Sequence, residues 1–326
     1  MNRLTDFSYE QFDLSDIKTY ALDARRSKAH VADFVRPIPS ASGISRFVDS
    51  LPNILAAADF KTIVRTLVET KRQRGGILWG FGGHVIKTGV GPAIIQLMER
   101  GFVSALATNG AGMIHDFEIA LIGATSEDVD EALGPGRFGM ADETGRVLNE
   151  LITQGAAEGL GIGQSVGRFL RTAGAPFAQA SVLAAAARLD IPVTVHVAIG
   201  TDIIHMHPAA SGAALGEGSL RDFRYFVTNV SRLERGVYLN CGSAVVLPEV
   251  FLKAVALARN RGIEFAELTT VNIDFMRMYR AMTNVVARPT KVSGRGYSLV
   301  GHHEIMIPLL AAAVIDLEEQ HDRESA

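Results

Sequence analysis

The sequence predicts an α/β protein in which helices cover both faces of a mostly parallel sheet. Short apolar runs alternate with segments of helical periodicity along most of the chain, as expected of parallel strands joined by crossover helices. Three of these apolar runs end in glycine-rich turns directly before a helix. The composition, with 48% hydrophobic and 21% charged residues, is typical of a globular protein with a substantial core.

The chain begins with a polar segment. Residues 1–45 lack an apolar pattern and carry two prolines near their end, so we expect an N-terminal arm there. The alternating pattern then continues without a linker, and residues 46–326 are predicted to form a single α/β domain. Its first helix spans 56–74, where apolar residues recur at helical spacing, a basic KRQR end suits the helix dipole and a glycine pair follows.

The remaining elements follow from the same kinds of signal. Prolines in first helical turns, capping residues such as Ser126 and glycine stops mark the helix ends. Buried apolar runs predict strands at 77–79, 103–107, 193–198, 237–239 and 264–271. Helical spacing predicts further helices at 89–100, 113–121, from 126 onward, 143–159, 164–174, 181–189, 248–261 and 304–317.

Charge and composition exclude several classes of protein. The chain has 32 basic and 35 acidic residues, and its net charge of −3 argues against nucleic acid or an anionic membrane surface as the main partner. No apolar stretch approaches the roughly 20 residues that span a bilayer, and the acidic start does not resemble a signal peptide. We therefore expect a cytoplasmic protein. The single cysteine, Cys241, rules out an intramolecular disulfide and a multi-cysteine zinc site.

Glycine-rich turns follow three of the predicted strands, at 80–89 (GFGGHVIKTG), 107–116 (ATNGAGMIHD) and 239–244 (LNCGSA). Ligands of open α/β sheets bind outside the carboxyl ends of the strands, where glycines let backbone N–H groups approach a phosphate. The turns therefore predict a nucleotide-like ligand, although glycine also simply makes tight strand-to-helix turns. None of them matches G-x-G-x-x-G or G-x-x-x-x-G-K-[ST], so a standard dinucleotide fold or a P-loop gains no support.

Histidines gather at the predicted strand ends. Two lie in the first two glycine turns, the segment His205-Met-His207 follows a strand, and Gly301-His-His-Glu304 precedes the last helix. A neutral imidazole can act as a general base near pH 7 or bind a metal. Proton transfer is favoured because no His-Glu-x-x-His spacing occurs. The candidate acid–base residues are His115, His205, His207 and His302.

Carboxylates also follow the predicted strands. Asp116 and Glu118 follow the second turn, Asp202 follows the strand at 193–198, and Asp274 follows the strand at 264–271. Such a carboxylate can bind a ribose hydroxyl or a cationic amine, or it can cap a helix, and the sequence leaves both roles open. Cys241 is interpreted as a small packing residue, because no base can be paired with it as a nucleophile.

Four segments between Ile77 and Ile315 match one enzyme family in residue class and spacing. They are residues 80–112, IPVTVHVAIGTD, NCGSAVVLPE and IMIPLLAAAVI, which resemble the first two strand–turn–helix units, the threonine–aspartate stretch, the triple-glycine turn and the final helix of deoxyhypusine synthases. The resemblance implies a Rossmann-like NAD-binding fold of the kind shared with sirtuins, and a homotetramer with sites between subunits. With the glycine turns, it suggests NAD contacts at Gly82, Gly83, His84, Thr108, Asn109, Gly110, Gly112, Asp202, Gly242, Ser243 and Asp274.

The catalytic motif of that family is missing. Deoxyhypusine synthases oxidise spermidine with NAD and pass its aminobutyl group through an enzyme lysine to a protein lysine. The family's lysine stands in a Trp-Gly-Lys motif, whereas Trp79 is the only tryptophan here and Lys291 lies near the corresponding stretch without the motif. The paired glutamates of the family's second turn become Ile114 and His115. We therefore expect no deoxyhypusine synthase activity and retain Lys291 only as a candidate catalytic residue.

These observations predict an NAD-binding enzyme, transferase-like or oxidoreductase-like, that acts on a small polar or amine substrate other than the deoxyhypusine precursor. One alternative is a non-catalytic nucleotide-binding or assembly protein that kept the fold, and another is a histidine-based metal-dependent enzyme. Imidazoles at the strand ends favour an enzyme, because a scaffold has no need of them there. We expect these histidines to share one pocket beside the nucleotide.

Overall fold

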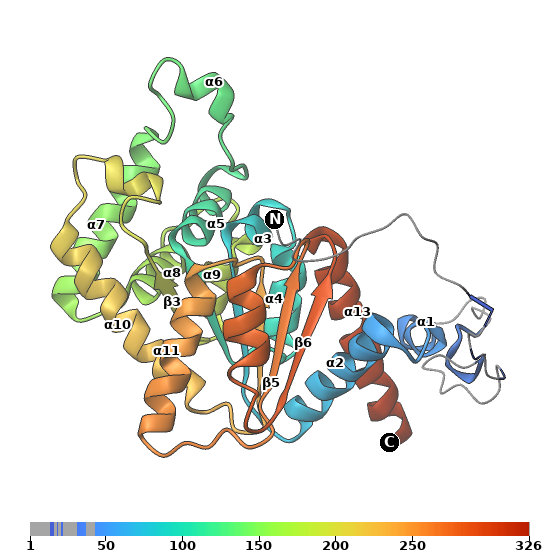
Figure 1. Ribbon diagram of the computed structural model, residues 1–326. Helices are drawn as coiled ribbons and strands as arrows, with labels where there is room; N and C mark the ends of the chain where they lie inside the picture. The colour runs from blue at the N-terminus through green and yellow to red at the C-terminus, as the bar shows by residue number, and fades with distance from the viewer. Residues whose placement is uncertain (1–13, 16–17, 19–20, 22–30, 37–42, 326) are drawn as a thin grey trace, which may run out of the picture.

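The computed structural model describes residues 14–15, 18, 21, 31–36 and 43–325 (Figure 1). Most of the expected N-terminal arm, residues 1–45, therefore lies outside the described residues. The described part of that segment includes the short 3-10 helix η2 (Val31–Asp33) and the start of α1 (Ile44–Ser50).

A six-stranded sheet forms the centre of the molecule, in the order β3-β2-β1-β4-β5-β6, and every neighbouring pair is parallel. Its strands are β1 (Ile77–Phe81), β2 (Ala105–Asn109), β3 (Val193–His196), β4 (Val237–Cys241), β5 (Thr269–Asp274) and β6 (Arg295–Val300). This is the strand order of the Rossmann fold, in which the winding direction reverses between β1 and β4. The predicted α/β class with a parallel sheet is confirmed, and the Rossmann order is present although the three glycine turns after the strands lack the usual G-x-G-x-x-G motif.

Alternating side chains of the strands enter two cores, one on each face of the sheet. On one face, Trp79 and Leu239 belong to a core that also contains residues of α1, α2 (Leu55–Arg72), α4 (Gly91–Glu99), α5 (Gly110–Ile122), α7 (Asp142–Glu158), α8 (Ile162–Thr172), α9 (Val182–Arg188) and α13 (His303–Ser325). On the other face, Leu78 and Tyr238 pack against α10 (Gly212–Val230), α11 (Val246–Asn260) and the π-helical segment η5 (Met282–Ala287). Because both faces are covered, β1, β4 and β5 are buried along their whole length.

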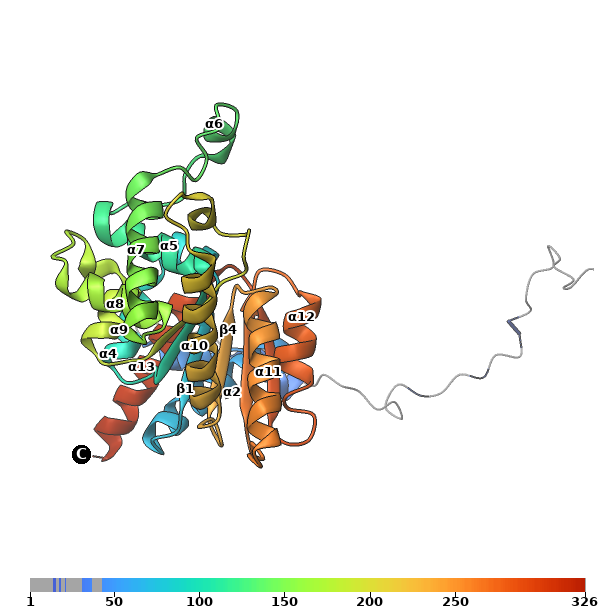
Figure 2. The same ribbon diagram turned by 90° about the vertical axis from the view of Figure 1, so that its left-hand side faces the viewer.

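The shorter elements lie mainly near the carboxyl ends of the strands. They are α3 (Gly83–Lys87), α6 (Val129–Leu133), η3 (Ala178–Ala180), η4 (Ile203–Met206) and α12 (Tyr279–Ala281). Figures 1 and 2 both show α6 projecting from the body of the molecule. Among the helices of the described residues, none is long and apolar enough to cross a membrane.

Several elements of the structure have no counterpart in the predicted pattern, and the reason is clear for α3, α10 and β6. The helix α3 is only five residues long and lies inside the first glycine turn. The helix α10 begins with the glycine-rich sequence GAALGEG, which weakens its helical signal. The strand β6 is an edge strand in which only Leu299 is fully buried, so it lacks a continuous apolar run.

Several predicted boundaries are shifted, and in two cases the backbone shows why. The strand expected at 264–271 lies at Thr269–Asp274, because Phe265 and Glu267 have positive φ angles of 54° and 61° and form a turn. The expected cap Ser126 also has a positive φ, of 70°, and the side chain of Asp128 caps α6 instead by accepting from Glu131 N–H at 3.2 Å.

Candidate functional site

The turns at the carboxyl ends of the central strands are linked to one another. Gly82 N–H donates to the carbonyl oxygen of Cys241 at 3.0 Å, and Gly242 N–H donates to that of Ile273 at 3.0 Å. Each turn therefore continues the sheet by one residue beyond its strand. These turns flank the point between β1 and β4 where the winding direction reverses, which is the usual ligand site of open α/β sheets.

Five side chains, which we call the His303 cluster, gather beside these turns: His84, Asp274, Phe275, His302 and His303. The ring of His303 is fully buried, and its centroid lies 5.3 Å from that of His84. Its Nε2 lies 3.3 Å from the carbonyl oxygen of Ile273 and 3.8 Å from Asp274 Oδ1. Because a carbonyl only accepts, the neutral ring carries its proton on Nε2. Nδ1 is then an acceptor, buried and without a partner among the described residues.

Burial controls the charge of this cluster. It lowers the pKa of His303, although the nearby Asp274 acts in the opposite direction. Burial also raises the pKa of Asp274. The N–H of Phe275, which donates to the Asp274 carboxylate at 2.8 Å, acts in the opposite direction. Both shifts favour neutral groups, so the cluster presents an uncharged imidazole at neutral pH. In the part of the chain that the structure describes, no three histidine, cysteine or acidic side chains are placed to hold a metal ion.

The glycines at the turns are required by the packing of the protein itself. A Cβ atom on Gly82 would lie 2.3 Å from the carbonyl oxygen of Gly242. One on Gly242, whose φ is 62°, would lie 2.7 Å from Cε1 of His303, and one on Gly83 would lie 3.1 Å from Cδ2 of His115. These contacts bring both histidines against the turns. The glycines by themselves are therefore no evidence for a bound phosphate.

The turn after β2 is occupied by the protein's own side chains. Asn109 Oδ1 accepts from Gly112 N–H at 2.9 Å and caps α5. The Asp202 carboxylate lies over the start of the same helix, so that a Cβ atom on Gly110 would lie 2.1 Å from its Oδ2. Burial raises the pKa of Asp202 to about 6, although the N–H of Ala111 donates to it. The Asp202 carboxylate thus occupies the positive amino end of α5, where a phosphate would otherwise bind. Its Oδ2 is buried without a partner among the described residues.

His115 belongs to a hydrogen-bond chain that starts on α5. Its Nδ1 lies 2.7 Å from Thr125 Oγ1, and the Thr125 hydroxyl donates to Glu118 Oε2 at 2.5 Å. The Thr144 hydroxyl, from α7, donates to Glu118 Oε1 at 3.0 Å. Burial lowers the pKa of His115, and Glu118 opposes this shift.

His205 and His207 bind the backbone of their own loop. His205 Nδ1 accepts from the N–H groups of Gly200 at 3.2 Å and Asp202 at 3.4 Å. His207 Nδ1 accepts from the N–H two residues later at 3.1 Å, and its Nε2 lies 3.5 Å from Asp142 Oδ1 on α7. The structure therefore places His84, His115, His302 and His303 around the β1 and β4 turns, while His205 and His207 brace the loop after β3.

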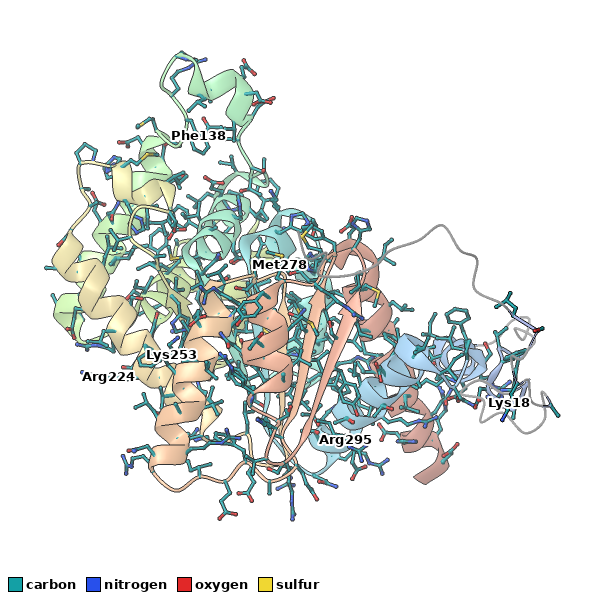
Figure 3. All side chains as sticks on the ribbon, viewed as in Figure 1. Lys18, Phe138, Arg224, Lys253, Met278 and Arg295 are labelled. Atoms are coloured by element: carbon teal, nitrogen blue, oxygen red, sulfur yellow. The ribbon has the colours of Figure 1, made fainter. Side chains whose placement is uncertain are left out.

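The other predicted site residues are spread over the sheet. The Thr108 hydroxyl donates to the carbonyl oxygen of Phe81 at 3.0 Å, and Ser243 Oγ accepts from Leu247 N–H at 3.2 Å at the start of α11. Lys291 is exposed and precedes the amino end of β6, whereas the glycine turns lie at the carboxyl edge. Figure 3 labels Arg295, the first residue of β6, well below Met278, which follows β5. The length of β6, about 20 Å, separates Lys291 from His302 within one chain.

Asp116 and Cys241 have structural surroundings. The buried Asp116 carboxylate accepts from the N–H groups of Val182 at 2.7 Å and Leu183 at 3.0 Å, and from the hydroxyl of Ser181. It therefore caps α9 and not its own helix. Cys241 is fully buried, and burial raises its pKa, which disfavours a reactive thiolate.

The predicted acid–base residues include the exposed His302 but not the buried His303 beside it. A usable signal was present in the spacing of α13. Its buried residues include Ile307, Leu310 and Val314, and extending this helical spacing back by one turn reaches residue 303.

A cavity of about 590 Å³ lies away from the His303 cluster. It is lined by α8, α9 and the amino end of β3, with Arg168, Arg171 and Tyr225 among its walls. The cavity therefore opens at the opposite edge of the sheet from the glycine turns and is separate from the candidate site.

The comparisons with known proteins concern the fold. A family model described as the C-terminal Rossmann fold of ArgZ-like arginine dihydrolases matches residues 61–157. No curated protein matches the sequence.

Solved structures cover more of the chain at low identity. AgrE, solved in a ternary complex with ornithine and NAD+, is 17% identical with a TM-score of 0.55, over 81% of this chain and 33% of AgrE. An LOR/SDH-type protein from Methanococcus maripaludis S2 is 18% identical with a TM-score of 0.50, over 80% of this chain and 70% of that one. A deoxyhypusine synthase-like protein from Entamoeba histolytica is 11% identical with a TM-score of 0.44, over 87% and 97% of the two chains.

These relationships are all distant. The chain spans about a third of the length of AgrE. The family match supports a Rossmann-like α/β fold, and the sheet of this chain is parallel throughout.

Proposed function

We propose that this chain is an enzyme that binds NAD at the turns between β1 and β4 and acts on a small amine or amino acid. One observation carries the proposal: two buried acceptor atoms without described partners flank the β1 turn. They are Nδ1 of His303, whose ring places Cε1 and Nε2 against Gly242, and Asp202 Oδ2 beside Gly110. An unpaired buried acceptor costs about 1–3 kcal/mol, and a ligand with hydroxyl or N–H donors at this place would remove that cost.

The residues present fit a dinucleotide. In Rossmann proteins an acidic residue near the end of the second strand binds ribose hydroxyls. Here that strand ends in Asn109, and the carboxylate beside it is that of Asp202, which would hold the ribose. Beyond the turns, the exposed Phe275 and Met276 offer an apolar surface for a flat ring.

The protein's own groups would manage protons while the cofactor, when bound, supplies a hydride acceptor. Burial keeps His303 and His115 neutral near pH 7, so both can accept a proton. The Asp274 carboxyl beside His303 can bind a cationic amine. Lys291 lies at the other edge of the sheet, which disfavours transfer of an aminobutyl group through it within one chain.

The distant relatives support the same choice of ligands. AgrE was solved with NAD+ and ornithine, an amino acid that carries a second amine. We propose on this basis that residues 46–326 work as a single nucleotide-binding domain, with a substrate other than the deoxyhypusine precursor.

Calorimetric titration of the whole chain with NAD+, NADP+ and ADP-ribose tests the proposal. We expect heat of binding with NAD+ and weaker binding by about 10- to 100-fold in Asp202→Asn, which loses a charged hydrogen-bond acceptor. Asp130→Asn, an exposed change on α6, is the matched control and should bind as the unchanged protein does. No heat with any of the three ligands would reject the proposal.

A further inference from the structure

The hydrogen bonds around His115 decide which of its nitrogens carries a proton. The single hydroxyl proton of Thr125 is donated to Glu118 Oε2 at 2.5 Å, because an ionised carboxylate only accepts. Thr125 Oγ1 can then only accept in its 2.7 Å contact with His115 Nδ1. The proton of the neutral ring is therefore on Nδ1, and Nε2 presents a lone pair.

The Glu118 carboxylate, which ends the series of hydrogen bonds from His115 through Thr125, is held from two sides. Besides the bond from Thr125, Glu118 Oε1 accepts from the Thr144 hydroxyl of α7 at 3.0 Å. Glu118 lies one helical turn after His115 on the same face of α5. With both oxygens engaged, the carboxylate cannot rotate away from Thr125, so the direction of the Thr125 hydroxyl is set as well.

The free side of the His115 ring faces the β1 turn. Its Cδ2, which is bonded to Nε2, would lie 3.1 Å from a Cβ atom on Gly83, the neighbour of His84 in the His303 cluster. The charged groups that act on the ring are Glu118 on α5 and Lys87 on α3. Burial and Lys87 lower the pKa of His115 and Glu118 raises it, with a net lowering that leaves the ring neutral near pH 7.

We propose that His115 accepts a proton from the substrate through Nε2, and that Thr125 and Glu118 are positioning residues that fix its tautomer. This inference rests on the proposed function, since it needs a substrate at the β1 turn. When an ammonium or hydroxyl group of the substrate gives its proton to Nε2, the ring keeps its Nδ1–H bond to Thr125. The Glu118 charge then stabilises the imidazolium through that hydroxyl, as a carboxylate orients a catalytic histidine directly in other enzymes.

The tautomer can be measured on the protein alone, by long-range ¹H–¹⁵N NMR of a ¹⁵N-histidine-labelled sample. We expect His115, assigned by its loss in His115→Gln, to be the Nδ1–H tautomer. His205 is an internal reference of the opposite kind, because its Nδ1 accepts from two backbone N–H groups and its proton must be on Nε2. An Nε2–H tautomer or an equal mixture at His115 would overturn the proposal.

Variants separate positioning from a merely structural role. Thr125→Val removes the acceptor and should abolish the fixed Nδ1–H state, whereas Thr125→Ser should keep it. Thr228→Val, an exposed threonine of α10, is the control for the substitution itself. If Thr125→Val lowers stability but leaves the His115 tautomer unchanged, the hydrogen bonds of Thr125 only anchor the segment before α6, and the proposal is wrong.

The effect of the Glu118 charge on His115 can be measured separately. Glu118→Gln should lower the pKa of His115 in an NMR titration, because the carboxylate raises it; an unchanged pKa would contradict the stabilising role. NAD+ binding should survive Thr125→Val, since Thr125 does not touch the proposed ribose site. In the unchanged protein, absence of the Nδ1–H tautomer of His115 with intact NAD+ binding would reject the positioning role of Thr125 and Glu118 alone. Absence of NAD+ binding with that tautomer present would reject the proposed function alone.

Discussion

Three buried aspartates hold the starts of helices that belong to other segments. Asp116 caps α9, and Asp202 binds the start of α5. Asp222 of α10 accepts from Gly163 N–H at 2.9 Å, at the start of α8, and from Val195 N–H at 2.8 Å on the edge strand β3. Burial raises the pKa values of Asp116 and Asp202 to about 6 and that of Asp222 to about 7. The hydrogen bonds that these carboxylates accept act in the opposite direction. The titration of these three carboxyl groups therefore makes the free energy of unfolding depend on pH.

The contribution of Asp222 to the free energy of unfolding should fall as the pH rises from about 6.5 to about 8. In this window unfolded Asp222, with an ordinary pKa of 3.8, has already lost its proton, while the folded state, with a pKa of about 7, releases it only as the pH rises through the window. The folded state binds more protons, so stability decreases with pH, by about 1 kcal/mol for this group. At lower pH the buried His196, whose pKa is lowered to about 3, acts in the opposite sense because the unfolded chain protonates it first. Urea unfolding across the window measures the slope.

Asp222→Asn is the test of that assignment. It keeps the size of the side chain and removes the titration, so its stability should vary less with pH over the same window. Asp130→Asn, on the exposed side of α6, should keep the slope of the unchanged protein. A slope in Asp222→Asn as steep as the original would show that another group is responsible.

Gly242→Ala should destabilise the fold more than Gly262→Ala. Both glycines have positive φ angles, 62° and 86°, where alanine costs about 1–2 kcal/mol. Only at Gly242 would the new Cβ atom meet a side chain, His303 at 2.7 Å, whereas the space around Gly262 is open. Overpacking against the buried ring adds about 1–3 kcal/mol. Equal losses in urea unfolding would show that the contact with His303 has no energetic consequence.

At the scale of elements, tertiary contacts explain the helix that the sequence pattern missed. The glycines of α10 weaken its intrinsic helical preference, yet the helix forms because Phe226 and Val230 enter the core with Tyr238. One of its glycines, Gly218, is needed for the approach of α8, since a Cβ atom there would lie 2.8 Å from Cγ1 of Ile162. Another, Gly216, has open space around it.

Gly216→Ala should therefore stabilise the protein by about 0.5–1 kcal/mol, because alanine loses less backbone entropy in a helix than glycine. Gly218→Ala lies in the same helix and carries the same entropic gain, but it meets Ile162, so we expect no stabilisation or a loss. Chemical unfolding of the two variants decides the matter. A gain in Gly218→Ala equal to that in Gly216→Ala would contradict the close packing of α10 on α8.

At the scale of the whole molecule, the carboxyl edge of the sheet combines the candidate site with exposed apolar side chains. Phe275, Met276, Tyr279, Val300 and Ile305 are each at least 44% exposed near the His303 cluster. Apolar surface around a site is typical of ligand binding or of contact with another chain. The homotetramer predicted from the sequence is one assembly that would cover such a surface.

We expect light scattering to give a mass of about four chains of 35.0 kDa each. If the carboxyl edge is a subunit contact, Tyr279→Glu should shift the mass toward smaller species, because a charge would be buried there. Val292→Glu places the same charge on an exposed residue before β6 and should leave the mass unchanged. The mass of a single chain at micromolar concentration would reject the tetramer.

The features of the candidate site that could be predicted are those that short stretches of sequence specify. Glycine turns and strand-end histidines are visible as short motifs, and Ser181 was correctly expected to begin a helix, where it accepts from Ala184 N–H. The role of His303 depends on burial against Ile273, thirty residues earlier in the chain. The partners of His115 and Asp116 likewise come from other elements, and no local pattern specifies which carboxylate will meet which helix start.

The sequence by itself determined the α/β class, the parallel strands and the edge of the sheet that carries the candidate site. Apolar alternation and turn glycines are properties of neighbouring residues, and burial of both sheet faces follows from them. Only the tertiary structure decided the strand order, the sixth strand, the placement of Lys291 at the opposite edge and the proton positions on the histidines. These depend on hydrogen bonds and desolvation between residues far apart in the chain, which sequence spacing does not encode.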